Sequence, residues 1–306
     1  MNRTSLTLPS FAKINWFLRV LGKRDDGFHE LCTVFQTISL KDTISFTESP
    51  ELNLTSDDRD ISTDEQNLIL RSARALKEKF EIERGAEIHI QKNIPFPGGL
   101  GGGSSNAAIT LLALTILWDA PARLADLIDI GSGIGSDVSY FFYGGTAFGK
   151  GRGNQISGLA ELSEKYLLIA TPNIEVSTAE AFSKLGAERL TKNDSKSILQ
   201  NCYDDAERLE LGHLELVNDF EKVIFQIFPE IGKTKEKLLD FGAKHALMTG
   251  SGASVFGVFD NEETRQAAFE SFSKEISTRI FAVETVSRAE YQEFLRPCER
   301  LFSDSF

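Results

Sequence analysis

The chain has 306 residues, of which 41% are hydrophobic and 25% charged, and its formal net charge is −12 at pH 7. This composition is typical of a folded globular protein and excludes a largely disordered chain. The negative charge argues against a general nucleic-acid or anionic-membrane surface, because both need clustered Lys and Arg. The length exceeds what one hydrophobic core usually supports, so two domains sharing a cleft are expected.

The sequence predicts no membrane span or leader segment. The longest strongly apolar stretch, 107–118, is shorter than the roughly 18 residues that a bilayer requires, so it predicts a buried helix. The first ten residues lack the apolar region of a signal peptide and the Arg-rich character of a transit peptide, which favours a cytoplasmic location. The cysteines and histidines show no spacing typical of zinc or redox sites, so no structural metal is expected.

The N-terminal part is predicted to be rich in strands. Apolar residues alternate over 14–20, the period of a strand with two distinct faces, and Lys13 stands at its entrance. A charged turn at 23–27 is followed by extended runs over 31–39 and around 43–47.

A helix and a strand, loop, helix unit come next. Thr63 and Gln66 form a capping-box pattern, and apolar residues at helical spacing then predict a helix over about 67–80. A strand around 88–90 leads through a glycine-rich loop into a helix that starts near Ser104.

The second half is predicted to have a ferredoxin-like split βαβ arrangement, with a helix over 262–274. Its strands are expected at 166–170, 245–248, 254–259 and 280–285. The fold class is therefore α+β, with an N-terminal domain over 1–160 and a C-terminal domain over 161–306.

The glycine-rich loop is the most informative segment. Five glycines let the backbone turn its N–H groups toward one anion, and the two serines lie at a helix N-terminus that favours phosphate. A flexible surface loop is the alternative. The loop lacks the Gly-Lys-Ser/Thr ending of a Walker loop and does not fit GxGxxG, which weakens a hydride-transfer interpretation. The loop consists of Pro95, Phe96, Pro97, Gly98, Gly99, Leu100, Gly101, Gly102, Gly103, Ser104 and Ser105.

Three other segments each allow a structural interpretation beside a chemical one. Asp137 follows a tight glycine turn, as a helix N-cap or a positioned catalytic acid does. The glycine turn at 249–252 joins two strands and suits a simple tight turn. A lysine at the mouth of a strand, as Lys13 is, is usually solvated, and the histidine within 26–30 suits a packing role. The chemical interpretation therefore depends on these segments occurring together, and not on any one of them.

Taken together, these segments resemble the GHMP kinase superfamily. The matching stretches are FAKINWFLRVLGKRDDGFHEL, GGLGGGSSNAA, GSDV and MTGSGASVF, and they follow the family order. The resemblance implies a two-domain kinase with an ATP-binding N-terminal lobe and a ferredoxin-like C-terminal lobe. The DGFHE segment resembles members whose substrate is a small cytidine diphosphate-linked alcohol. Other members act on mevalonate, homoserine or sugars, and a non-catalytic nucleotide sensor on the same fold is a further alternative.

The resemblance also implies roles for individual residues. Lys13 and Asp137 correspond to the catalytic pair, and the loop from Pro95 to Ser105 to the ATP site. Phe28, where the family usually has Tyr, and His29 correspond to the cytidine site. The further positions are Asn67 facing adenine, and Asn15, Lys92, Thr178 and Phe182 as weaker substrate contacts.

A mechanism follows as a hypothesis. Phosphoryl transfer asks the protein mainly for positioning and charge stabilisation. Asp137 accepts a hydrogen bond from the attacking alcohol and acts either as a base or as an orienting group, while Lys13 keeps its carboxylate ionised. Mg²⁺ prefers oxygen ligands and bridges phosphates, so the Ser105 hydroxyl is a candidate contact. The sequence leaves the oligomeric state open.

Overall fold

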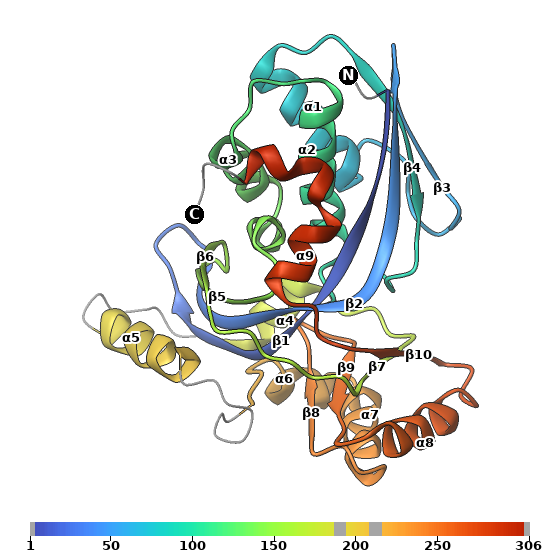
Figure 1. Ribbon diagram of the computed structural model, residues 1–306. Coiled ribbons are helices and arrows are strands. Elements are labelled where there is room, and N and C mark those ends of the chain that lie inside the picture. Colours follow the sequence, from blue (N-terminus) through green and yellow to red (C-terminus); the bar gives the residue numbers. More distant parts are fainter. Residues whose placement is uncertain (1–3, 187–193, 208–215, 303–306) are drawn as a thin grey trace.

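A computed structural model describes residues 4–186, 194–207 and 216–302. It contains a six-stranded and a four-stranded sheet, each covered by its own helices, one above the other in Figure 1. The strands of the larger sheet are β1 (Ser5–Lys23), β2 (His29–Ser49), β3 (Leu52–Ser56), β4 (Gly85–Gln91), β5 (Thr146–Gly151) and β6 (Gln155–Gly158).

The long hairpin of β1 and β2 organises the larger sheet. The two strands pair antiparallel from Ser5 opposite Thr47 to Lys23 opposite His29. On the other edge of β2, its first half pairs with β5 and its second half with β4. The extended runs predicted at 31–39 and 43–47 are therefore one strand. Its polar middle lies opposite a register shift between Phe11 and Ala12, and such an irregularity lets a strand continue past residues that suggest a turn.

Helices cover one face of this sheet, with α2 at the centre of the core. The predicted buried helix is confirmed, because Ala107 to Leu114 are all fully buried. Helix α2 begins at Gly102, slightly before the predicted start, because the left-handed Gly101 directs the following glycines into the first turn. The elements on this face are α1 (Leu68–Phe80), α2 (Gly102–Leu117), α3 (Leu124–Ile134) and the short 3-10 helix η1 (Ser136–Phe142).

The helix predicted over 67–80 is also confirmed as α1, but its predicted cap is wrong. Asn67 is the N-cap, and its Oδ1 accepts a hydrogen bond from Ile69 N at 2.9 Å. Asn is among the strongest N-caps, and it directly precedes the first helical residue, whereas the Thr63 and Gln66 pair lies a turn too early.

The second sheet has the predicted split arrangement. Its strand order is β10-β7-β9-β8. Strand β9 therefore lies between β7 and β8, although both precede it in the sequence. The strands are β7 (Leu167–Pro172), β8 (His245–Met248), β9 (Val255–Val258) and β10 (Thr278–Val283). The helices of this half are α4 (Thr178–Leu185), α5 (Asp194–Glu207), α6 (Glu221–Ile227), α7 (Pro229–Asp240) and α8 (Glu262–Phe272).

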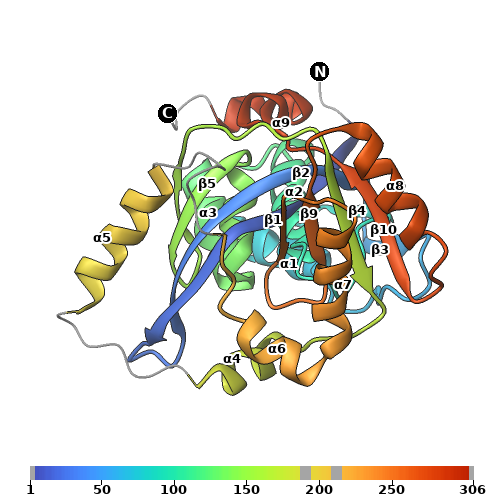
Figure 2. The ribbon, with the colours of Figure 1, turned by 90° about the horizontal axis from the view of Figure 1, so that it is seen from below.

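The last helices return to the first half of the molecule. Helix α9 (Arg288–Phe294) leads into the 3-10 helix η2 (Arg296–Leu301), which contacts α2, and Figure 1 shows both at the level of the larger sheet. Figure 2 shows α9 at the outer edge of the molecule. Tyr291 belongs to the same buried cluster as α2, and its hydroxyl donates to Phe141 O at 2.6 Å. The chain passes from the larger to the smaller sheet between Gly158 and Leu167, and the domain division at residue 160 stays a prediction.

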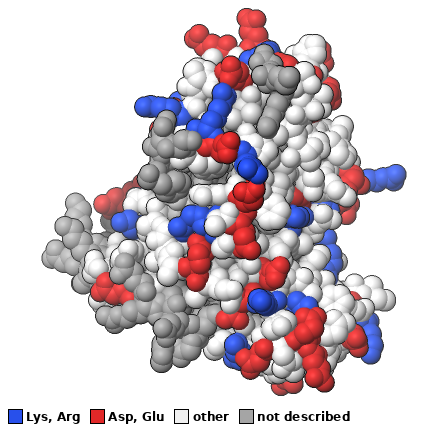
Figure 3. All heavy atoms as spheres, in the orientation of Figure 1, with Lys and Arg blue, Asp and Glu red and all other residues white. Residues whose placement is uncertain are grey.

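The surface has mixed charge. On the face in Figure 3, acidic and basic side chains are interspersed, without a continuous basic patch among the described residues. Within the described ranges, no helix combines the length and apolar character that crossing a bilayer requires.

Candidate active site

The structure brings Lys13 and Asp137 together. Strand β1 carries Lys13 into the interior, and Asp137 lies in the first turn of η1, after the extended Gly135. Lys13 Nζ lies 3.4 Å from Asp137 Oδ2, and the two side chains are 3% and 32% exposed. The lysine is therefore fixed by burial, while its carboxylate partner remains accessible to a ligand.

Three neighbours hold the Lys13 ammonium group. It donates to Asn15 Oδ1 at 2.8 Å, pairs with Asp137, and lies 5.6 Å from the centre of the Phe35 ring. Burial lowers the pKa of Lys13, and the charge and hydrogen bond of Asp137 oppose that shift. The pair thus couples a buried ammonium group to an accessible carboxylate.

Asn15 connects this pair to the second half of the molecule. Its Oδ1 also accepts hydrogen bonds from Gly250 N at 3.0 Å and from Thr249 Oγ1 at 3.1 Å. Asn218 supports the same glycine turn, because its Nδ2 donates to Met248 O at 2.7 Å and to Gly250 O at 2.8 Å. Sequence reasoning missed Asn218, since no motif surrounds it.

The glycine-rich loop is held by backbone contacts from both halves. Lys13 N donates to Leu100 O at 2.9 Å, and Ser254 N donates to Gly98 O at 3.2 Å. Gly99 has a φ of +72°, and a Cβ added to it would lie 2.2 Å from Thr249 O. A side chain at Gly99 would strain the loop, which is a fixed structure rather than a flexible surface segment.

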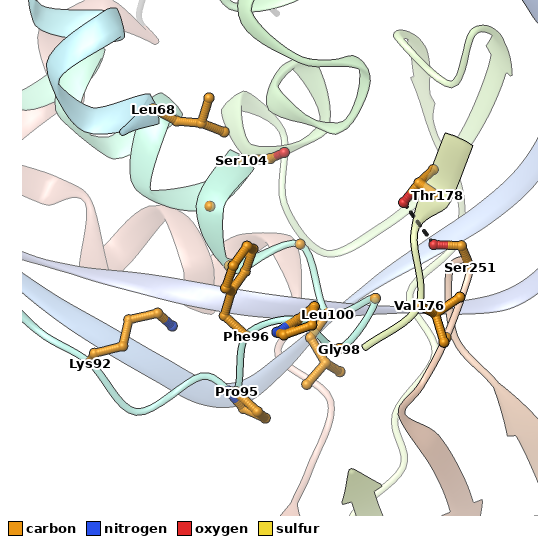
Figure 4. Close-up of a pocket in the computed structure, with 16 residues that line it drawn as sticks. Leu68, Lys92, Pro95, Phe96, Gly98, Leu100, Ser104, Val176, Thr178 and Ser251 are labelled. Carbon is orange, nitrogen blue, oxygen red and sulfur yellow. Dashed lines mark hydrogen bonds between the residues drawn. The ribbon is translucent and has the colours of Figure 1, made fainter. Parts of the chain in front are cut away.

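A pocket opens over this loop, which we call the loop pocket (Figure 4). Leu68 and Phe96 project into it from α1 and from the loop. On its other side, the hydroxyls of Thr178 and Ser251 form a 2.9 Å hydrogen bond. The N-terminal amides of α2 border the pocket, which suits an anion. The lining residues are Leu68, Lys92, 95–104, Val176, Thr178, Ser251 and Gly252.

Lys92 belongs to the loop pocket rather than to the Lys13 side. Its Nζ lies 2.9 Å from Asp42 Oδ2 and also donates to Ile94 O. Asp42 Oδ1 accepts from the N–H groups of Asn93 and Ile94, each at 2.8 Å. Burial lowers the pKa of Lys92, and Asp42 opposes that shift. This buried pair fixes the segment that leads into the loop.

Two other predicted ligand residues are engaged in the fold. The Asn67 side chain caps α1 and donates to Ser62 O at 2.6 Å, while the neighbouring Leu68 lines the loop pocket. Ser105 is fully buried, and its Oγ lies 2.7 Å from Ser10 Oγ of β1, while the neighbouring Ser104 lines the pocket.

A second pocket, which we call the lysine pocket, contains the Lys13 and Asp137 pair. Gly99, Gly101, Thr178 and Ser251 line both pockets, and we call these four residues the shared wall. The other lining residues are Lys13, Asn15, Leu18, Leu31, Thr33, Phe35, Asp137, Phe182, Phe220 and Gly250. A group bound in one pocket therefore lies next to a group bound in the other.

Aromatic side chains lie beside the lysine pocket. His29 stacks on Phe182 of α4, with ring centres 4.7 Å apart and an interplanar angle of 15°. Burial, together with the Lys23 charge, lowers the pKa of His29. Phe28 is 48% exposed, and the Arg152 guanidinium lies 3.9 Å from its ring centre. Sequence reasoning missed Arg152, although an arginine between two glycines was a signal.

Comparison with known proteins places the chain in a family. Residues 67–145 match the GHMP kinases N terminal domain, and residues 195–277 match the GHMP kinases C terminal. A protein of Thermodesulfovibrio yellowstonii is 38% identical over 271 residues, which cover 87% of this chain and 94% of that protein. The chain belongs to the GHMP kinase family.

The resemblance seen in the sequence and the predicted fold class are thereby confirmed, and ATP is the phosphoryl donor of this GHMP kinase. The T. yellowstonii relative is named 4-diphosphocytidyl-2-C-methyl-D-erythritol kinase, as is one from Bacillus thuringiensis that is 37% identical over 96% of this chain and 100% of its own.

Solved structures agree with this assignment. A crystal structure of 4-(cytidine 5'-diphospho)-2C-methyl-D-erythritol kinase has 28% identity and a TM-score of 0.72, over 92% of this chain and 99% of the other. Homoserine kinase from Cytophaga hutchinsonii has a TM-score of 0.69 over 94% of this chain and 96% of the other, but at 20% identity it supports the fold alone.

Proposed function

We propose that this GHMP kinase transfers the terminal phosphoryl group of ATP to the 2-hydroxyl of 4-diphosphocytidyl-2-C-methyl-D-erythritol, in the non-mevalonate route to isoprenoid precursors. The observation that carries the proposal is the position of Lys13 and Asp137 beside the shared wall, where the two pockets meet. The names of the relatives support the choice of substrate.

The loop pocket binds ATP in this proposal. Its backbone N–H groups and the N-terminus of α2 hold the phosphates, and Leu68 and Phe96 offer apolar surface to the adenine. The shared wall then places the γ-phosphate toward the lysine pocket, because Gly99 and Gly101 line both.

The acceptor alcohol occupies the lysine pocket. The Asp137 carboxylate accepts a hydrogen bond from the hydroxyl and orients its oxygen toward the γ-phosphorus. Lys13 keeps Asp137 ionised, and its positive charge offsets the charge on the transferring group. Phe28 and His29 bind the cytidine, with Phe182 linking His29 to the pocket.

A Mg²⁺ ion fits this site as a partner of the ATP phosphates. Within the described ranges, no group of three or more His, Cys, Asp or Glu residues forms a metal cage. Mg²⁺ needs none, because it keeps several waters and binds through phosphates and one or two protein oxygens. When bound, the ion neutralises phosphate charge. Ser105 remains the candidate ligand, and its hydroxyl must then turn from Ser10 toward the phosphates.

The partner of this enzyme is thus a small cytidine diphosphate-linked alcohol, used in the cytoplasm. The test incubates the protein with Mg-ATP and, in separate reactions, 4-diphosphocytidyl-methylerythritol, mevalonate or homoserine, and follows ADP release. The cytidyl compound should be preferred. Preference for another alcohol overturns the substrate assignment, and binding of ATP without turnover of any acceptor identifies a sensor instead. Asp137→Asn, run in parallel, separates acceptor-dependent turnover from background ATP hydrolysis.

A further inference from the structure

The hairpin between β1 and β2 is fixed against the turn between β5 and β6. The Arg24 guanidinium pairs with Glu30 at 2.5 Å and with Asp26 at 3.1 Å. Glu30 is buried, and its Oε1 accepts from Gly151 N at 2.9 Å. The positive charge of Arg24 is therefore used within the hairpin.

Arg152, in the same turn, is engaged differently. Its guanidinium lies over the half-exposed Phe28 ring, 3.9 Å from the ring centre. Its Nε is buried and has no hydrogen-bond acceptor among the described residues. A guanidinium over an aromatic ring keeps its donors in its own plane, and a buried donor without an acceptor costs free energy. The charge of Arg152 also contributes to the lowered pKa of Asp26, the carboxylate that pairs with Arg24. The guanidinium of Arg152 thus retains hydrogen-bond donors to offer a ligand.

The position of Arg152 lies between the two ends of the proposed substrate. Its side chain contacts Phe28, on the cytidine side. The next residue, Gly153, approaches the reacting end, because a Cβ added there would lie 4.0 Å from Asp137 Oδ1. In the acceptor molecule, a diphosphate joins the nucleoside to the alcohol, so the diphosphate lies between the groups that these two residues contact.

The charged residues that line the lysine pocket do not by themselves offset the charge of a diphosphate. Among the residues that line it, Lys13 and Asp137 are the charged ones, and they form an ion pair with each other. A nucleoside diphosphate brings at least two negative charges. We propose that Arg152 binds the diphosphate of the acceptor substrate, through the planar fork of donors that suits phosphate. The inference rests on the proposed function, which supplies the diphosphate.

The test compares the binding of cytidine and of cytidine diphosphate to the full chain by calorimetry, for wild type, Arg152→Ala and Arg152→Lys. Arg152→Ala should weaken the binding of cytidine diphosphate by about tenfold or more, and the binding of cytidine by less than about twofold. The affinity of Arg152→Lys for cytidine diphosphate should lie between those of wild type and Arg152→Ala, because lysine keeps the charge but lacks the planar fork of donors. In turnover assays, the KM for the cytidyl acceptor should rise while kcat and the KM for ATP change little.

Arg296→Ala is the matched control, since it removes the same charge from a side chain that is 71% exposed and paired with Glu293. An equal loss for cytidine and its diphosphate in Arg152→Ala means that Arg152 only supports Phe28, and it overturns the inference. So does unchanged binding of both. Wild type that neither binds the diphosphate nor phosphorylates the cytidyl acceptor overturns the proposed function as well, which separates the two failures.

Discussion

The loop pocket and the lysine pocket are built in different ways. The loop pocket is lined mainly by one continuous stretch, 95–104, whose backbone N–H groups and glycine conformations shape it. The lysine pocket takes side chains from β1, β2, η1, α4 and the glycine turn at 249–252, which are far apart in the sequence. If the proposed function holds, the phosphates are recognised by local backbone geometry, whereas the binding of the acceptor alcohol depends on the tertiary fold.

The shared wall sets the relation between the two pockets. Gly99 packs against the backbone of Thr249, and Asn15 bonds the same glycine turn while it holds Lys13. Lys13 and the glycine-rich loop are thus fixed to one turn from the second half of the chain. Three comparisons of variants test whether the pockets can be separated, in order of decreasing effect.

The largest effect is expected from Asp137→Asn, which alters the lysine pocket alone. The amide keeps the approximate shape but loses the negative charge that, in the proposed function, orients the alcohol. We expect kcat to fall by about 10²-fold or more, with little change in ATP binding. Steady-state kinetics and ATP titration measure both quantities.

Asp260→Asn controls for the removal of one carboxylate, because Asp260 is 72% exposed and pairs with Lys244 in the second half. It should turn over normally. Near-normal turnover in Asp137→Asn would remove this residue from the mechanism, and an equal loss of ATP binding would show that the two pockets are not separable in this way.

A smaller effect, spread over both pockets, is expected from Gly99→Ala. The new Cβ meets Thr249 O and strains a left-handed backbone. We expect the KM for ATP to rise by about tenfold, and Tm to fall by about 4 °C or more, for roughly 2 kcal/mol of strain. Enzyme kinetics and a thermal melt measure these changes.

Gly133→Ala is the matched control, since a Cβ at this position in α3 meets nothing within 4 Å. The same substitution should leave the KM for ATP unchanged and Tm equal or higher, because Ala favours a helix over Gly. If Gly99→Ala behaves in the same way, the shared wall does not depend on the close approach of Gly99 to Thr249.

The difference between the pockets also explains what the sequence could predict. The loop was predictable because its glycines and the following helix are contiguous, and the split βαβ sheet followed from the order of its strands. Asn218 and the return of Tyr291 to the first core were not predicted, because each acts through contacts between residues far apart in sequence. The continuous β2 was missed because Asp42 resembles a turn residue, whereas it is buried against Lys92.

The smallest effect concerns the pH dependence that separates the two buried lysines. Burial, partly offset by Asp137, holds the pKa of Lys13 below its ordinary 10.5. If protonated Lys13 is needed for transfer, kcat falls as the pH rises through this lowered pKa, so the alkaline limb of the profile lies below pH 10.5. Lys13→Arg should remove that limb, because a guanidinium stays protonated at this pH, and its plateau rate should be lower.

Lys92→Met removes the other buried amine with a lowered pKa and should leave the limb in place, since Lys92 holds the loop pocket and not the reacting groups. A limb that disappears in Lys92→Met and persists in Lys13→Arg assigns the titration to the loop pocket, and the division of roles between the pockets is then wrong.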